Sequence, residues 1–184
     1  TLVYVAGGAA GAPARTLVWV DREGHEEPIA AADARPYLYP RLSPDGGRIA
    51  VEIRDQENDV WVWNLARQTL TRITSDPGID QAPVWTPDGL RLVFASSQGG
   101  GVGSLFWQAA DGTGTAERLT DSPNYQRPSA VSSDGRHVLF WEAAPRTATD
   151  VMMLTLDKDR RVQPLIQGPL VDRNAELSPD GKWL

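Results

Sequence analysis

The stretch Leu42-Ser43-Pro44-Asp45-Gly46 decides the fold, because close copies of it recur along the chain. The copies are Trp85-Thr86-Pro87-Asp88-Gly89, Val131-Ser132-Ser133-Asp134-Gly135 and Leu177-Ser178-Pro179-Asp180-Gly181. An Asp-Gly pair between apolar runs predicts a β-hairpin turn, since glycine accepts the positive φ that such a turn needs. We interpret the recurring aspartates as structural turn residues that bond to neighbouring backbone N–H groups: Asp45, Asp88, Asp134 and Asp180.

Two further elements repeat at the same interval of about 45 residues. Trp-rich or apolar runs lie at 17–20, 60–63, 105–107 and 151–154, and runs centred on Ile or Leu lie at 28–29, 72–74, 118–120 and 164–166. Each unit thus has four short runs whose β-branched and aromatic residues favour strands. The period predicts an all-β fold, a β-propeller built from four-stranded antiparallel blades.

The repeats predict one partial propeller over residues 1–184 with about four blade equivalents. The blade units are 37–75, 80–121 and 125–167, and a split blade that combines 1–30 with 173–184. Residues 1–5 lack the strand that precedes them in the other units, and 174–178 supply such a strand. An unpaired sheet edge invites association, so we expect closure of a four-bladed ring, a homo-oligomer through the open blade edges, or a place in a larger ring.

These residues resemble the TolB-like propeller repeat, which is WD40-like. The resemblance rests on the Ser-Pro-Asp-Gly turns, on Asp59-Val60-Trp61 and on Arg72-Ile73-Thr74, and the third turn departs from it with Ser133 in place of Pro. Residues 16–24 and 108–114 are similar to stretches in propellers fused to bacterial serine/threonine kinases. The resemblance implies six or more blades in the whole propeller, binding of protein or peptide partners, and an extracytoplasmic or periplasmic location.

The composition excludes several functions. The formal net charge is -6, which opposes binding to nucleic acid phosphates. The sequence has no cysteine and only two histidines, His25 and His137, at different positions of the repeat, so we expect no metal and no other cofactor. No apolar run is long enough for a transmembrane helix, and we expect no membrane insertion by this segment.

We find no catalytic motif. Gly101-Val102-Gly103-Ser104 lacks the last glycine of a nucleophile elbow and falls in an expected hairpin loop. Asp80 and Asp172 are a carboxylate pair that glycoside cleavage could use only at the right separation. We therefore expect that this chain is not itself an enzyme.

The innermost strand of a blade lines the central channel, and the loop before it lies at the channel mouth. The residues at these positions differ from unit to unit and mix aromatic, amide and charged groups, which suits a peptide or a polar small molecule. The candidate ligand-binding residues are Tyr37, Tyr39, Arg41, Asp80, Gln81, Tyr125, Gln126, Arg127, Asp172, Arg173 and Glu176.

The leading hypothesis is a non-catalytic binding module with its ligand at the channel mouth, as part of a larger sensor-type protein. The first alternative is the gating propeller of a larger serine hydrolase similar to prolyl oligopeptidases. The second alternative is a structural, self-assembling propeller fragment.

Overall fold

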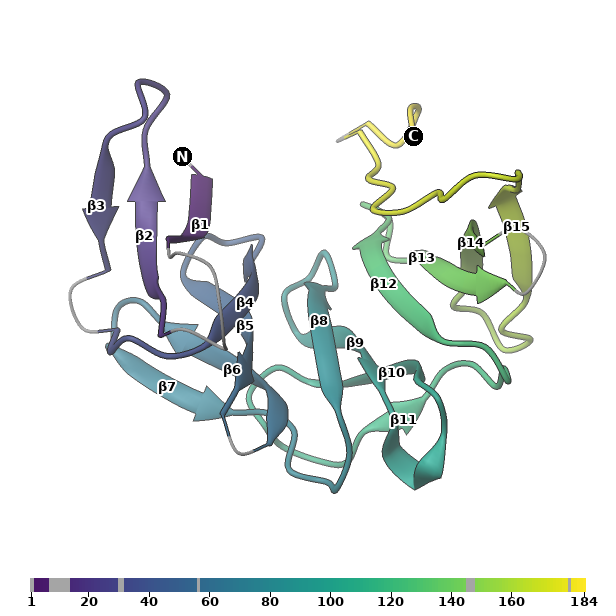
Figure 1. The fold of residues 1–184 in the computed structure, drawn as a ribbon, viewed down its shortest axis with the longest axis horizontal. Helices are drawn as coiled ribbons and strands as arrows, with labels where there is room; N and C mark the ends of the chain where they lie inside the picture. The colour runs from purple at the N-terminus through teal and green to yellow at the C-terminus, as the bar shows by residue number, and fades with distance from the viewer. Residues whose placement is uncertain (1, 7–13, 30–31, 56, 145–147, 179) are drawn as a thin grey trace.

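The computed structural model describes residues 14–29, 32–55, 57–144, 148–178 and 180–184, and the backbone of residues 2–6. In these parts of the chain, four antiparallel β-sheets follow one another along an arc (Figure 1). The helical content of the described residues is one short 3₁₀ turn, η1 (Gln98–Gly100), and no helix there could cross a membrane. The predicted all-β architecture of antiparallel blades is confirmed.

Each sheet is a meander in which consecutive strands are hydrogen-bonded neighbours. The first sheet comprises β1 (Leu2–Ala6), β2 (Thr16–Val20) and β3 (Glu26–Pro28). The second comprises β4 (Tyr37–Leu42), β5 (Arg48–Arg54), β6 (Asn58–Asn64) and β7 (Thr69–Arg72). The third comprises β8 (Asp80–Trp85), β9 (Arg91–Ser96), β10 (Ser104–Ala109) and β11 (Glu117–Arg118). The fourth comprises β12 (Gln126–Val131), β13 (His137–Ala144), β14 (Ala148–Thr155) and β15 (Val162–Ile166).

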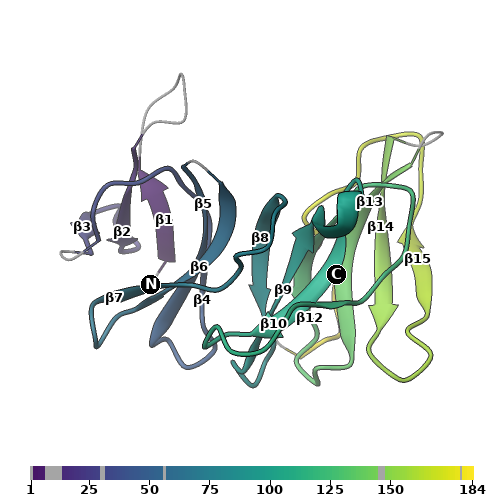
Figure 2. The ribbon, with the colours of Figure 1, turned by 90° about the horizontal axis from the view of Figure 1, so that it is seen from below.

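The hydrophobic cores lie between neighbouring sheets (Figure 2). One core joins Leu17 of the first sheet to Ile49 of the second. The next joins the second and third sheets, and the last packs Leu105 of the third sheet against Phe140 of the fourth. Both faces of a middle sheet are therefore buried, which explains why β5 and β9 have runs of consecutive buried residues instead of an alternating pattern.

The recurring aspartates all stand in the same turn. In each copy the glycine N–H donates to the carbonyl three residues earlier at 2.8 Å. The preceding hydroxyl donates to the aspartate, as Ser132 Oγ does to Asp134 at 2.6 Å, and a backbone N–H two residues later donates as well. These hydrogen bonds, the one from the hydroxyl first and the one from the N–H second, hold the pKa of Asp134 below its usual value. The pKa values of the other three turn aspartates are lowered in the same way.

The two ends of the chain lie on different sheets. Among the described residues the first sheet has the three strands β1, β2 and β3, and β2 is the strand that pairs with β1, so the split blade stays a prediction. The last turn packs instead on the fourth sheet: a methyl group at Gly181 would lie 4.0 Å from Ser133 Oγ, as one at Gly135 would lie 3.4 Å from Pro87. Residues 177–178 and 180–183 thus occupy the place of the next blade's first hairpin, and the arc stays open between the N- and C-termini (Figure 1).

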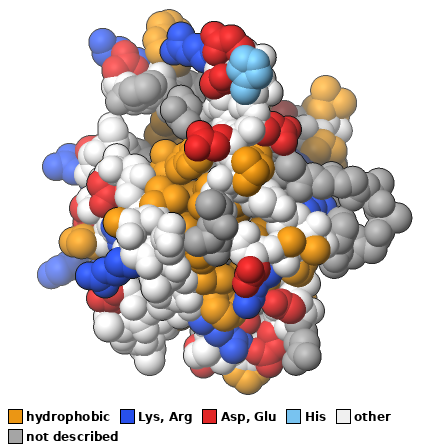
Figure 3. Space-filling view, turned by 90° about the vertical axis from the view of Figure 1, so that its left-hand side faces the viewer, with side chains coloured by type: hydrophobic (Ala, Val, Ile, Leu, Met, Phe, Trp, Pro, Cys, Tyr) orange, Lys and Arg blue, Asp and Glu red, His pale blue; other side chains and the backbone are white. Residues whose placement is uncertain are grey.

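The flank of the arc beside the first sheet is partly apolar. Seen from that side, hydrophobic side chains gather at the centre of the face, with charged side chains around them (Figure 3). A homo-oligomer that covers this flank with a second copy stays a prediction.

Candidate functional site at the propeller axis

The innermost strand of each complete sheet carries a β-bulge. Leu38 and Arg41 of β4 both pair with β5, and β4 has one residue more between these two positions than β5 has between their partners. The same irregularity occurs between Gln81 and Val84 in β8 and between Pro128 and Ala130 in β12. Tyr39 and Ala82 lie at this position with φ values of 48° and 52°. A side chain in this left-handed region costs about 1–3 kcal/mol, and bulges commonly serve to redirect side chains.

The bulges meet at the axis and form what we call the axial site. A narrow pocket lies there, with a volume of about 20 Å³. Its lining residues come from three sheets and the C-terminal segment: Tyr39, Arg41, Ala82, Pro83, Val84, Arg127, Pro128 and Asn174. Asn174 also has a positive φ, of 56°, as Tyr39 and Ala82 do. A pocket of this size holds about one water molecule, so it can take one small polar group and not a threaded chain.

Two arginines dominate the axial site. The Arg127 guanidinium carbon lies 3.8 Å from the centre of the Tyr39 ring. Arg41 pairs with the Glu176 carboxylate at 2.9 Å and donates to the Ser129 carbonyl at 3.3 Å. These contacts join residues about 90 to 135 positions apart in the sequence, so the axial site exists only when the sheets are assembled.

The start of β8, the loop before β12 and the C-terminal segment form the adjoining mouth. The Tyr125 hydroxyl donates to Gln81 Oε1 at 3.0 Å, and the Tyr125 and Trp141 rings are 5.4 Å apart. Arg173 covers the Trp141 ring at 4.8 Å. Burial raises the pKa of Tyr125, so its hydroxyl stays protonated and continues to donate at neutral pH.

A buried carboxylate fixes the third sheet to the second beside this mouth. Glu52 in β5 has no exposed surface, yet it accepts a hydrogen bond from Ala82 N at 3.2 Å and pairs with Arg54. The Ala82 N–H belongs to the bulge of β8. Glu52 therefore satisfies a backbone donor that the bulge removes from the sheet ladder.

The structure brings most of the predicted residues together but removes three of them from solvent. Tyr39, Arg41, Arg127 and Glu176 contact one another in pairs at the axis, while Gln81, Tyr125 and Arg173 stand at the mouth. Asp172 is half-buried, with its N–H bonded to the Thr149 carbonyl.

Tyr37, Asp80 and Gln126 are only 1–3% exposed and lie between the sheets. They share the first position of the inner strand, where the side chain turns towards the neighbouring sheet. Gln126 bonds there to Thr120 and Glu142, and burial raises the pKa of the Asp80 carboxyl. A ligand in the channel cannot reach these three residues, and the hypothetical pair of Asp80 with Asp172 lacks an accessible first carboxylate.

Sequence reasoning missed Trp141, which pairs with Tyr125, and Asn174, which lines the axial site. Asn174 stands at the same position of the repeat as Tyr39 and Ala82, so the period alone could have identified it. Trp141 follows a buried strand run and gives no such signal. Within the described ranges, no three His, Cys, Asp or Glu side chains are grouped to hold a metal ion.

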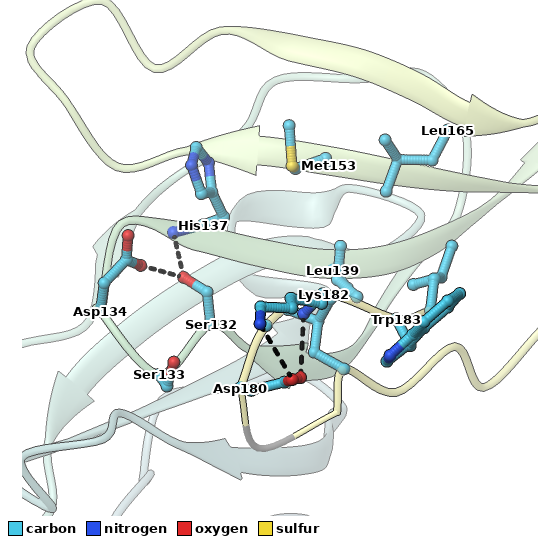
Figure 4. A pocket seen from close by; sticks show the side chains of 13 residues that line it. Ser132, Ser133, Asp134, His137, Leu139, Met153, Leu165, Asp180, Lys182 and Trp183 are labelled. Carbon is cyan, nitrogen blue, oxygen red and sulfur yellow. Dashed lines mark hydrogen bonds and ion pairs between the residues drawn. The ribbon is translucent and has the colours of Figure 1, made fainter.

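A larger groove, of about 550 Å³, lies between the fourth sheet and the C-terminal turn. Figure 4 shows His137, Met153 and Leu165 along one side, with Lys182 and Trp183 opposite. A groove of about 610 Å³ occupies the equivalent junction between the third and fourth sheets. Because the groove recurs where blades stack, we regard it as a consequence of the repeat rather than a separate site.

Four meander sheets around a common axis define a β-propeller segment. The family model described as the TolB beta propeller domain matches residues 14–184, and the chain belongs to this family.

Curated relatives agree with the family. The chain is 35% identical over 101 residues to the Tol-Pal system protein TolB of Alcanivorax borkumensis, covering 54% of this chain and 23% of the relative. It is 30% identical over 106 residues to an uncharacterized protein of Agrobacterium fabrum, covering 57% of this chain and 36% of that protein. The chain thus spans about a quarter to a third of these relatives.

Solved structures show the same fold. TolB from Acinetobacter baumannii superposes with a TM-score of 0.80 at 22% identity, over 98% of this chain and 44% of that one. A putative TolB from Agrobacterium tumefaciens gives 0.75 at 26% identity, over 91% of this chain and 63% of that one. A prolyl endopeptidase gives 0.61 at 15% identity, covering 85% of this chain and 26% of the enzyme, which is similarity of fold alone.

Proposed function

We propose that this chain is a non-catalytic protein-interaction module that binds a peptide or small polar ligand at the axial site and its mouth. The observation that carries the proposal is the convergence of strained, bulged strands on one pocket lined by Tyr39, Arg41 and Arg127. Backbone strain of this kind clusters at functional sites, because a stable fold keeps it only where the surroundings enforce it.

Family membership supports the same proposal. The curated relative from Alcanivorax borkumensis is named as a protein of the Tol-Pal system. By analogy, we propose that this chain also acts by contacting other proteins, outside the cytoplasm and as part of a larger sensor-type protein. The sequence contains no cysteine and no nucleophile motif, so the proposal assigns it no reaction.

The test is a selection of binding peptides from a random library, followed by mapping on the protein. We expect the selected peptides to protect the inner strands β4, β8 and β12 from hydrogen exchange. The double variant Arg127→Ala/Arg173→Ala should lose binding while its thermal unfolding stays close to that of the parent. Protection confined to outer strands such as β7 and β15, with full binding by the double variant, contradicts the proposed location.

The alternative of a gating propeller in a larger serine hydrolase has one supporting observation, the similarity of fold to a prolyl endopeptidase. Under this alternative, axial substitutions would change access of peptide substrates to a hydrolase domain encoded in the same gene. Finding such a domain in the gene, together with wild-type peptide binding by the Arg127 and Arg173 double variant, would favour the gate.

A further inference from the structure

The axis concentrates positive charge in an acidic protein. The chain has a formal net charge of -6, yet Arg41, Arg127 and Arg173 stand at the axis and its mouth. Among the described residues, the carboxylate that pairs with one of these three arginines is that of Glu176, which contacts Arg41. A positive centre surrounded by an acidic surface attracts anions selectively to one place.

Arg127 is held in position without an ion-pair partner in the part of the chain that the structure describes. Its guanidinium stacks on the Tyr39 ring, and Nη2 is shielded from solvent with no hydrogen-bond partner among the described residues. On the neighbouring strand β13, the residue paired with Arg127 is Trp141, which carries no carboxylate. A shielded N–H that bonds to nothing is unfavourable, so this donor is prepared for an acceptor that arrives from outside.

The contact between Arg41 and Glu176 shows which acceptor fits. A carboxylate oxygen already lies 2.9 Å from Arg41 Nη1. Both side chains remain about half exposed, at 41% and 53%, so solvent and an incoming anion can compete for the pair. The axial site therefore contains an internal example of carboxylate recognition by its own arginines.

We propose that the axial arginines bind a side-chain carboxylate from an acidic segment of a partner protein. This inference rests on the proposed function and specifies its ligand. The pocket of about 20 Å³ has room for about one oxygen atom of a ligand, and the Glu176 carboxylate on Arg41 shows the kind of oxygen that these arginines bind. The overall charge of -6 also repels a polyanion such as nucleic acid, whereas a short acidic segment meets mainly the local arginines.

The test measures binding of three unlabelled hexapeptides, made of Glu, Gln or Lys, by titration calorimetry at low salt. We expect the Glu peptide to bind at least tenfold more tightly than the Gln peptide, since one hydrogen bond between charged groups corresponds to about that factor. Arg127→Gln should remove this advantage. The matched control is Arg22→Gln, which deletes the charge of an exposed arginine in the hairpin between β2 and β3 and should leave binding unchanged.

Glu176→Gln adds a variant with the opposite expectation. It frees Arg41 from its internal partner, so the Glu peptide should bind more tightly than to the parent protein, and this gain cannot come from partial unfolding. Arg127→Lys keeps the charge but loses the planar stack on Tyr39, and we expect an intermediate affinity.

The outcomes separate the inference from the proposed function. If the Glu and Gln peptides bind equally, and both depend on Arg127, the inference is overturned while binding at the axis stands. If the Glu peptide binds equally to the parent, Arg127→Gln and Arg22→Gln proteins, both fail. If the Glu peptide does not bind at all, the inference is overturned, and the library selection decides the proposed function separately.

Discussion

Gly103 is the position where a single methyl group should disturb both stability and the mouth of the axial site. Its φ is +123°, and a Cβ there would lie 2.6 Å and 2.8 Å from two ring carbons of Tyr125. Its carbonyl accepts a hydrogen bond from Gln126 N at 3.0 Å, which limits how far the backbone can retreat. We expect Gly103→Ala to push the Tyr125 ring away from Gln81 and Trp141.

The cost has two parts. An alanine in a backbone region that suits glycine costs about 1–3 kcal/mol. Forcing extra volume against a packed ring costs about 1–3 kcal/mol more. Together these two costs come to roughly 2–6 kcal/mol, which is a large share of the ~5–15 kcal/mol that stabilises a typical domain. At roughly 2–4 °C per kcal/mol for a chain of this size, the melting temperature should fall by about 4–24 °C.

Gly101→Ala is the matched control in the same loop. Gly101 has an ordinary φ of -77°, and a Cβ there meets nothing within 4 Å. Urea unfolding followed by tryptophan fluorescence should place Gly101→Ala within about 0.5 kcal/mol of the parent, as is usual for an exposed position. In a Tyr125→Ala background the Gly103→Ala cost should shrink to its backbone part. Equal stabilities of the two glycine variants would refute the reasoning.

Three other outcomes follow from the contacts described. Glu52→Ala should lower the free energy of unfolding by about 2–3 kcal/mol in urea, because it leaves the Ala82 N–H without its acceptor. Glu52→Gln keeps an acceptor and should cost about 1 kcal/mol. Equal losses in the two variants would contradict this role of Glu52. Ser133→Pro should raise stability by about 0.4–1 kcal/mol, since all three sister turns already hold proline there in the sequence, and a lower melting temperature would show that the third turn differs. Burial raises the pKa of Asp80 above its ordinary 3.8, so the folded state keeps this proton longer than the unfolded state; stability due to Asp80 is greatest at low pH and falls as pH rises through the native pKa. Asp80→Asn should remove that fall, and melting temperatures measured from pH 3 to pH 8 that keep the parent's slope would disprove it.

The sequence by itself determined the strand order and the turns. The interval of 43 to 46 residues between Asp-Gly pairs predicted the three complete sheets, which the structure finds at 37–72, 80–118 and 126–166. This part was predictable because hairpins depend on local chemistry. Positive φ at glycine, the hydroxyl that bonds to the turn aspartate, and short β-branched runs all act within about ten residues.

The tertiary structure alone decided which inner-strand residues face the axis. Strict alternation from Tyr37 places side chains on fixed sides of β4, but the bulge after Leu38 shifts the alternation, and no local pattern announces it. Asp80 and Gln126 precede the bulges of β8 and β12 and lie between the sheets, whereas Arg127 lies at the pocket.

The placement of the chain ends also lay beyond the sequence. The period predicted that 174–178 form an inner strand which completes a blade with residues 1–30, and it left open whether the two pair within one copy or between copies. The choice depends on the rotation from sheet to sheet, which results from side-chain packing across the three cores. Turn geometry is a property of a few adjacent residues and can be read from their order, whereas curvature and the meeting of Arg41 with Glu176 arise from contacts between residues far apart in the chain.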